Sequence, residues 1–136
     1  MKDFCIIGSG ISGSTIAHIL SKKYSLDVYD KARGAGGRSS NKKFNESESF
    51  DHGVQYVSPK SPQFKKFINN LIIKRIVKKW SGKHMFLKLD KKENKKHIKI
   101  IGNKGNNSIS KYLLKNISCI FNSELIKISN KEKVWE

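Results

Sequence analysis

The sequence predicts an α/β fold with a parallel sheet, and three observations near the N-terminus indicate it. An apolar run at Phe4–Ile7 is followed by a glycine-rich turn, then by apolar residues at helical spacing, then by a second strand-like stretch that ends at Asp30. Strand, glycine turn, helix and strand within about thirty residues form a βαβ unit. The 136 residues are enough for one ordinary domain with a single core.

Each element of this unit has its own signal. The continuous apolar run at Phe4–Ile7 is typical of a strand covered on both faces. Ile16, Ile19 and Leu20 recur at helical spacing, and two lysines follow where cations suit the helix dipole. The stretch "LDVYD" alternates apolar and polar residues up to Asp30, which predicts the second strand.

The middle of the chain predicts an extended stretch, a helix and a hairpin. "FDHGVQYV" at 50–57 is expected to be extended. In the helix that follows, Ser61 suits the N-cap and Pro62 the first helical position. "HMFLKLDKKENKKHIKII" at 84–101 predicts two strands about a charged, solvated turn. The helix has one apolar stripe, formed by Phe64, Phe67, Ile68, Leu71 and Ile72.

The C-terminal third predicts a short helix and two further strands. "GNNSISKYLL" carries Ile109, Tyr112 and Leu113 at helical spacing, and "ISCIF" and "ELIKI" are apolar strands. A strand-like alternation in "KEKVWE" then stops without a turn or a polar tail. We interpret this ending as the sign of a sequence that is part of a longer protein.

The charge of the chain is +17, and lysine supplies nearly all of it because Arg33, Arg38 and Arg75 are the only arginines. Specific nucleic-acid readers depend on arginine for bidentate contacts. Here the lysines are scattered among asparagines and isoleucines. We interpret them as a bias of composition and expect no specific nucleic-acid partner.

Cysteine usage and hydropathy indicate a location. Cys5 and Cys119 each lie in an apolar run, so buried free thiols and a reducing compartment are expected. Residues 4–20 are interrupted by three glycines and three serines and lack a small-residue cleavage site, which argues against a secretory signal. No segment reaches the ~18 apolar residues of a membrane span. We expect a cytoplasmic protein without a membrane partner.

The first glycine turn has the spacing of a phosphate-binding loop. In "GSGISG", Gly8, Gly10 and Gly13 stand at G-x-G-x-x-G, directly after a strand and at the start of a helix. Such glycines allow a tight turn, a close approach of the backbone to a pyrophosphate, and close packing of helix on sheet. Asp30 follows near the ~20-residue offset of the acid that binds a ribose. The pattern predicts a Rossmann-like fold that binds a dinucleotide.

A second glycine turn distinguishes between dinucleotides. An acid at Asp30 would repel a 2′-phosphate, which disfavours NADP, whereas NAD and FAD both keep a free ribose. "GAGGR" follows shortly after, with Gly36 and Gly37 for a second close approach and Arg38 for a positive charge. NAD does not need this second turn, because the first turn already holds its pyrophosphate. The sequence therefore favours FAD.

The stretches "CIIGSGISGSTIAHIL", "VYDKARGAGGRSS" and "FDHGVQYV" together resemble the FAD-binding region of the amine-oxidase superfamily of flavoproteins, especially its renalase-like members. The resemblance extends over nearly the whole chain. It implies a Rossmann-like FAD-binding domain in two parts, 1–71 and 103–136, the second truncated. Residues 72–102 would be an inserted β-hairpin from the start of a substrate domain, and the fold would be incomplete.

The resemblance also implies roles for residues. Asp30 would bind the adenosine ribose, and Arg38 would face the pyrophosphate and the ribityl chain. Gln55 and Tyr56 would lie near the isoalloxazine, and Leu125 would offer backbone contacts to adenine. The candidate cofactor-binding residues are Gly8, Gly10, Ile11, Ser12, Gly13, Asp30, Lys31, Gly36, Gly37, Arg38, Gln55, Tyr56 and Leu125.

The sequence departs from the family in three respects, one of which is His52 at a position that is usually apolar. Asp30 stands where a glutamate is commoner, and full-size relatives continue for roughly as much chain again. The resemblance implies the N-terminal part of an FAD-dependent oxidoreductase acting on an amine or a dihydronicotinamide, inactive alone. No catalytic base, nucleophile or metal ligand is evident. The alternatives are a nucleotide-binding regulatory module, which would bind NAD, and a basic nucleic-acid-binding protein.

Overall fold

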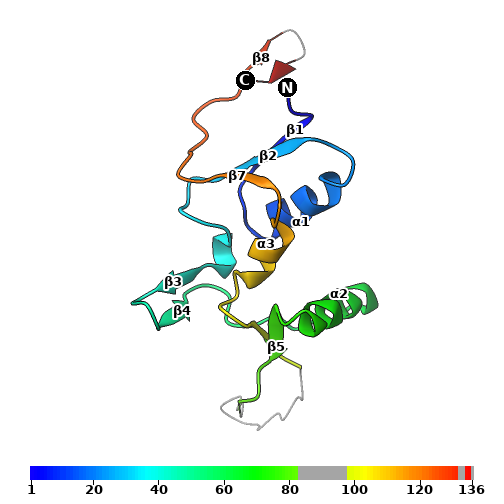
Figure 1. Ribbon diagram of the computed structural model, residues 1–136, viewed down its shortest axis with the longest axis vertical. Coiled ribbons are helices and arrows are strands. Elements are labelled where there is room, and N and C mark those ends of the chain that lie inside the picture. Colours follow the sequence, from blue (N-terminus) through cyan, green and yellow to red (C-terminus); the bar gives the residue numbers. More distant parts are fainter. Residues whose placement is uncertain (83–97, 132–133, 136) are drawn as a thin grey trace, which may run out of the picture.

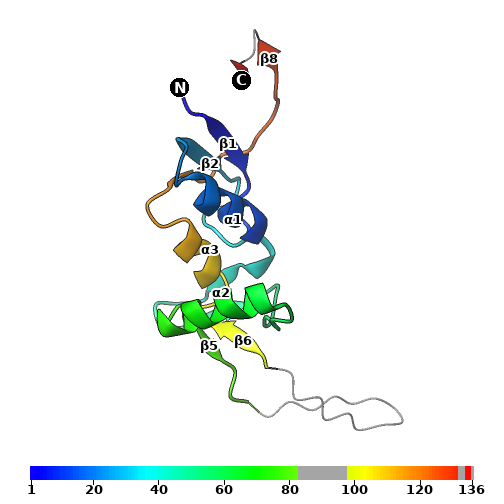
Figure 2. The ribbon, with the colours of Figure 1, turned by 90° about the vertical axis from the view of Figure 1, so that its right-hand side faces the viewer.

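The computed structural model describes residues 1–82, 98–131 and 134–135. The molecule is elongated, with the first βαβ unit in its upper half and the long helix α2 in its lower half (Figure 1, Figure 2). In chain order its elements are β1 (Phe4–Ile7), α1 (Ile11–Leu20), β2 (Leu26–Tyr29), the 3-10 turn η1 (Gly37–Ser39), β3 (Asn41–Lys43), β4 (Ser49–Asp51), α2 (Pro62–Ile73), β5 (Val77–Lys79), β6 (Ile100–Gly102), α3 (Ser108–Leu113), β7 (Ser118–Ile120), β8 (Asn130–Lys131) and β9 (Val134–Trp135).

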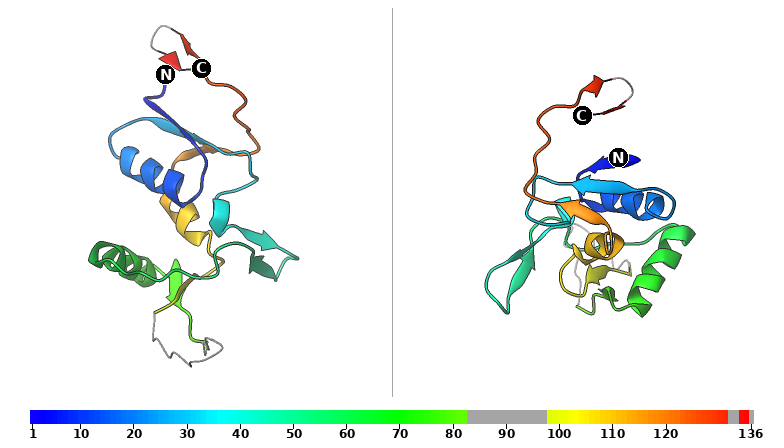
Figure 3. Two further views of the ribbon diagram at one scale, coloured as in Figure 1. Left: turned by 180° about the vertical axis from the view of Figure 1, so that it is seen from behind. Right: turned by 45° about the horizontal axis from the view of Figure 1, so that its top comes forward.

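A three-stranded parallel sheet carries the N-terminal unit. Its order is β1-β2-β7, with Ile6 opposite Val28 and Val28 opposite Cys119. Helices α1 and α3 lie on the same side of this sheet (Figure 3). The core between them is formed by Ala17, Leu26, Val28, Ala35 and Leu114. The predicted α/β class with a parallel sheet is therefore confirmed.

Strand β1 forms as predicted, but the prediction that it is covered on both faces is wrong. Phe4 is 40% exposed and Ile7 51% exposed, and Cys5 is an exposed free thiol rather than a buried one. Within the described residues, β1 pairs only with β2, and the helices cover the face that carries Ile6, whereas the face that carries Cys5 and Ile7 is open. Phe4 shares the face of Ile6 and lies at the exposed start of the strand. The second cysteine, Cys119, is half-buried and free.

Helix α1 also forms as predicted, and its completely buried residues are small. Ile16 and Ile19 are 50% and 59% exposed, whereas Ser14 and Ala17 are buried completely. Small residues let the helix lie close to the sheet and to α3, so the larger isoleucines are directed away from it. The apolar periodicity predicted the helix correctly, and of its three apolar positions Leu20 packs against this core.

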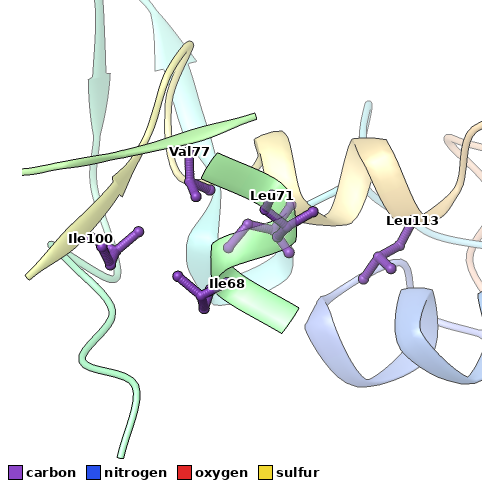
Figure 4. Packing of buried hydrophobic residues seen from close by; sticks show 6 residues of the cluster. Ile68, Leu71, Val77, Ile100 and Leu113 are labelled. Carbon is purple, nitrogen blue, oxygen red and sulfur yellow. The ribbon is translucent and has the colours of Figure 1, made fainter. Parts of the chain in front are cut away.

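A second core joins α2 to β5, β6 and α3. Figure 4 shows this cluster, with Ile68 and Leu71 of α2 near Val77 and Ile100. The predicted cap is confirmed, since the Ser61 hydroxyl accepts a hydrogen bond from the Phe64 N–H at 3.2 Å. The complete cluster is Ile68, Leu71, Val77, Ile100, Ile109 and Leu113.

The predicted hairpin at 84–101 lies mostly outside the described residues. Its end belongs to β6, which pairs antiparallel with β5 so that Val77 lies opposite Gly102. Strand β5 precedes the predicted hairpin and was not predicted. Its sequence carries only a short apolar signal. The division of the chain at residues 71 and 102 stays a prediction.

Three extended stretches differ in extent from the predictions. In "FDHGVQYV" only β4 is a strand, paired antiparallel with β3, while Val57 forms a single bridge to Ile100. The predicted strand "ELIKI" does not form, and Leu125 and Ile126 are 46% and 96% exposed. The chain leaves the sheet after β7, and no described strand pairs with this stretch. The alternation in "KEKVWE" corresponds to the small antiparallel pair β8 and β9.

Candidate dinucleotide-binding site

The first glycine turn packs β1 closely against the start of α1. Gly8 adopts a left-handed φ of 93°, and its N–H donates to the Tyr29 carbonyl of β2 at 2.7 Å. A Cβ added to Gly13 would lie 1.9 Å from the Gly8 carbonyl oxygen. Only glycine fits at position 13, so the backbone of the turn is held where the G-x-G-x-x-G pattern predicted.

The start of α1 has free N–H groups without a competing cap. Gly10 is the N-cap residue, makes no side-chain cap hydrogen bond, and is followed by no acidic residue in the first turn. Ser14 donates the first N–H of the helical ladder, to the Gly10 carbonyl at 2.9 Å. The N–H groups before it, including those of Ile11, Ser12 and Gly13, have no helical acceptor, and such groups favour an anion.

The second glycine turn lies directly against the first. Gly36 and Gly37 have left-handed φ values of 143° and 53°, and the Gly36 N–H donates to the Ser9 carbonyl at 3.2 Å. Gly10 and Gly36 form a β-bridge, and a Cβ added to Gly37 would lie 3.1 Å from the Gly10 Cα. The structure thus brings together two turns that lie more than twenty residues apart in the sequence.

Arg38 follows the second turn and is exposed. No acidic side chain among the described residues forms an ion pair with its guanidinium. Its guanidinium supplies a full positive charge and planar donors, which suit phosphate oxygens.

Asp30 is held by the first turn. Its Oδ2 accepts hydrogen bonds from the Ser9 N–H at 2.6 Å and from the Ser9 hydroxyl at 2.5 Å, and its Oδ1 accepts one from the Ala32 N–H at 2.8 Å. Burial raises the pKa of this carboxyl, but these hydrogen bonds and the nearby Lys31 outweigh burial and leave the pKa below its ordinary value. The half-buried group is therefore an ionised acceptor at neutral pH.

The segment after β7 runs alongside Asp30. The Ser123 N–H donates to the Asp30 carbonyl at 3.0 Å, and the exposed Lys31 lies 3.7 Å from Glu124. Leu125, the predicted adenine contact, is the next residue and is 46% exposed. The structure therefore brings this stretch next to Asp30 even though it forms no strand.

Gln55 and Tyr56 lie toward the second core. Gln55 is exposed, and its carbonyl accepts a hydrogen bond from the Asn106 side chain at 3.1 Å. The Tyr56 ring is 5.8 Å from the Trp80 ring, and the Lys99 Nζ lies 4.4 Å from the Tyr56 ring centroid. These two predicted site residues are grouped with β5 and β6 rather than with the glycine turns.

Sequence reasoning did not identify three residues that shape this region. A Cβ added to Gly53 would lie 2.0 Å from the Arg38 carbonyl oxygen, so Gly53 lets the chain pass close behind Arg38. Ser9 binds Asp30, and Asn106 donates to the Val54 carbonyl at 2.6 Å. The isolated glycine in "DHGVQY" could have indicated a close backbone approach. The roles of Ser9 and Asn106 depend on contacts with residues distant in the sequence, which no local pattern indicates.

Metal and membrane features are not found in the part of the chain that the structure describes. No group of three or more His, Cys, Asp or Glu side chains there could hold a metal ion. No helix there has the length and the apolar character needed to cross a membrane.

Two comparisons with known proteins give matches, and the family match is the one that supports the fold. A solved structure of a putrescine oxidase double mutant, from a structure-based redesign of cofactor binding, aligns over 58% of this chain with 28% sequence identity and a TM-score of 0.45. This chain covers 17% of that protein, less than a fifth of its length. Residues 6–71 match the family described as the NAD(P)-binding Rossmann-like domain. The chain therefore has a Rossmann-like α/β fold of the dinucleotide-binding kind.

Proposed function

We propose that the chain is the FAD-binding portion of a flavin-dependent oxidoreductase of the amine-oxidase superfamily, with an amine or a dihydronicotinamide as the substrate of the whole enzyme. The observation that carries this proposal is the contact between the two glycine turns at Gly10 and Gly36. One turn is enough for the pyrophosphate of NAD, whereas a second turn followed by Arg38 suits the longer FAD.

The residues present fit FAD as ligand. The crowded position of Gly13 keeps side chains out of the turn, and the uncapped start of α1 offers N–H groups to the pyrophosphate. Asp30 is an ionised acceptor for a ribose hydroxyl, and Arg38, directly after Gly37, is exposed. When bound, FAD would accept a hydride from the substrate and pass electrons to O₂.

This chain would bind and orient the flavin rather than supply an acid or base. No candidate base or nucleophile was evident in the sequence, and we assign none. Gln55 and Tyr56 remain proposed contacts of the isoalloxazine, and Leu125 a proposed contact of adenine. A cytoplasmic location belongs to the same proposal, supported by two cysteines that are both free.

The exposure of β1 supports the proposal that further polypeptide completes the active enzyme. Parallel strands are ordinarily covered on both faces. Here Cys5 and Ile7, on the face opposite Ile6, are both exposed, Ile7 by 51%, and β1 lies at the edge of the described sheet. We therefore propose that the chain alone binds FAD weakly and has no turnover.

A nucleotide-binding regulatory module without redox activity is the second candidate. The family description, an NAD(P)-binding Rossmann-like domain, favours it. This candidate predicts affinity for NAD that is equal to or greater than that for FAD, and it leaves the second glycine turn and Arg38 without a role.

Titration of the purified protein with FAD, NAD and NADP separates these candidates. We expect quenching of flavin fluorescence on binding, with FAD bound more tightly than NAD, and NADP bound least because Asp30 repels a 2′-phosphate. Arg38→Gln should weaken FAD binding by about tenfold, the scale of a charge-assisted hydrogen bond, and leave NAD binding unchanged. Arg33→Gln, an exposed arginine of the same loop, is the matched control.

The outcomes are distinct. Tighter binding of NAD than FAD, unaffected by Arg38→Gln, would favour the regulatory module. Stoichiometric flavin with full oxidase activity in the isolated chain would refute the proposal that further polypeptide is required.

A further inference from the structure

We propose that Ser9 is a positioning residue of the dinucleotide site, which orients the Asp30 carboxylate so that its Oδ1 accepts a hydrogen bond from a ribose hydroxyl. This inference rests on the proposed function, because it concerns the ribose of the same dinucleotide. Ser9 is a variable position in the G-x-G-x-x-G pattern, and the pattern itself assigns it no role.

The two residues are joined by more than one contact. Ser9 directs both its N–H and its hydroxyl to the same oxygen of Asp30, Oδ2, at 2.6 and 2.5 Å. Ser9 is completely buried, whereas Asp30 is half-buried. Packing therefore holds Ser9 in place, and the two hydrogen bonds of Ser9 hold the Asp30 carboxylate in place.

The division of contacts between the two carboxylate oxygens determines where a ligand can donate. A carboxylate offers about four lone-pair sites, two on each oxygen. Oδ2 already accepts two hydrogen bonds, while Oδ1 accepts one, from the Ala32 N–H at 2.8 Å. The remaining acceptor site is on Oδ1, so a ribose hydroxyl would be received there.

The hydrogen bonds from Ser9 restrict rotation of the Asp30 carboxylate before a ligand binds. A carboxylate that rotates freely loses conformational entropy each time it binds a ribose, whereas one held in place has already lost it. The hydroxyl of Ser9 also favours the ionised form of Asp30, which is the better acceptor. Ser9 thus acts on the ligand through Asp30 and need not touch the ligand.

The test begins with the unliganded protein. In Ser9→Ala, the pKa of Asp30, followed by the carboxyl carbon chemical shift in NMR, should rise relative to the unaltered protein. Lys31 and its ion-pair partner Glu124, the charged groups beside Asp30, are unchanged in this variant. Ser9→Cys keeps the volume with a weaker donor and should show a rise in the same direction.

Binding measurements then separate positioning from packing. Ser9→Ala should weaken FAD and NAD binding by up to about tenfold, the scale of a hydrogen bond to a charged group. If Ser9 acts through Asp30, adding Ser9→Ala to Asp30→Asn should change affinity by less than about twofold, as non-additivity of interacting residues requires. Ser110→Ala is the control, since Ser110 is also completely buried and lies in α3.

The outcomes separate this inference from the function on which it rests. The role of Ser9 would be overturned, with dinucleotide binding intact, if the pKa of Asp30 were unchanged in Ser9→Ala. The same conclusion would follow if Ser9→Ala cost as much affinity in the Asp30→Asn variant as in the unaltered protein. Failure of the unaltered protein to bind FAD or NAD would overturn the proposed function, and with it the ribose role.

Discussion

The closest approach in the candidate site gives the sharpest prediction, for the substitution Gly13→Ala. The added Cβ would lie 1.9 Å from the Gly8 carbonyl oxygen and 3.0 Å from the carbonyl carbon. Because real Cβ contacts are essentially never shorter than 3.0 Å, the start of α1 must move away from the turn by roughly 1 Å. Both crowded atoms of the turn are backbone, so no side chain can rotate to relieve the contact.

Overpacking of this kind costs about 1–3 kcal/mol, and a backbone neighbour places Gly13→Ala at the upper end, about 3 kcal/mol. That is a large part of the ~5–15 kcal/mol by which a domain is stable. A shift of the helix start also moves the N–H groups that would hold the pyrophosphate, so affinity for the dinucleotide should fall at least about tenfold. Urea unfolding followed by circular dichroism gives the first quantity, and fluorescence titration gives the second.

Gly34→Ala is the matched control for this substitution. No heavy atom lies within 4 Å of a Cβ added to Gly34, and its backbone is not left-handed. The same chemical change there should leave stability within about 1 kcal/mol, with a small gain from a less flexible unfolded chain. If Gly13→Ala matched Gly34→Ala in both stability and affinity, the packing of helix on turn described above would be wrong.

Three further substitutions or conditions test other parts of the structure. Ser61→Ala should cost about 1 kcal/mol in urea unfolding, because it removes the acceptor of the Phe64 N–H; an unchanged midpoint would contradict the cap. Since the folded-state pKa of Asp30 lies below its ordinary value of 3.8, its carboxylate stabilises the protein above that pH, and this contribution is lost as pH falls through the folded-state pKa. The stability difference between Asp30→Asn and the unaltered protein should therefore be largest near neutral pH and shrink in acid, as urea unfolding at several pH values would show. The exposed thiol of Cys5 should react with a disulfide reagent faster than that of Cys119, whose pKa is raised by burial; a fast phase that survived Cys5→Ser would contradict this.

Local signals were sufficient for the elements that form the site. The glycine spacing and the apolar run predicted β1, the turn, α1 and β2, and Ser61 with Pro62 predicted the start of α2, because caps and turns depend on a few neighbouring residues. The contact between Gly10 and Gly36 was also foreseeable, since both turns were assigned to one ligand.

Features that depend on distant partners were predicted less well. The exposure of Ile7 depends on what covers the sheet, and an apolar run alone does not contain that information. The stretch around Leu125 is apolar like a strand but has no described partner to pair with. The hydrogen bonds of Ser9 to Asp30 join residues twenty-one positions apart, and no pattern in the sequence marks a serine for this use.

The second glycine turn is linked physically to the second core through two neighbouring asparagines. A Cβ added to Gly36 would lie 2.8 Å from the Cβ of Asn107, so Asn107 packs directly behind the turn. Asn106 meanwhile accepts a hydrogen bond from the Gly102 N–H at 2.8 Å and donates to the Gln55 carbonyl at 3.1 Å. These asparagines immediately precede α3, whose residues pack in the core of α2, β5 and β6. The turn that would receive the flavin and the segment that carries Gln55 are therefore both in contact with the same pair of asparagines, so substitution of Asn106 or Asn107 is expected to affect both.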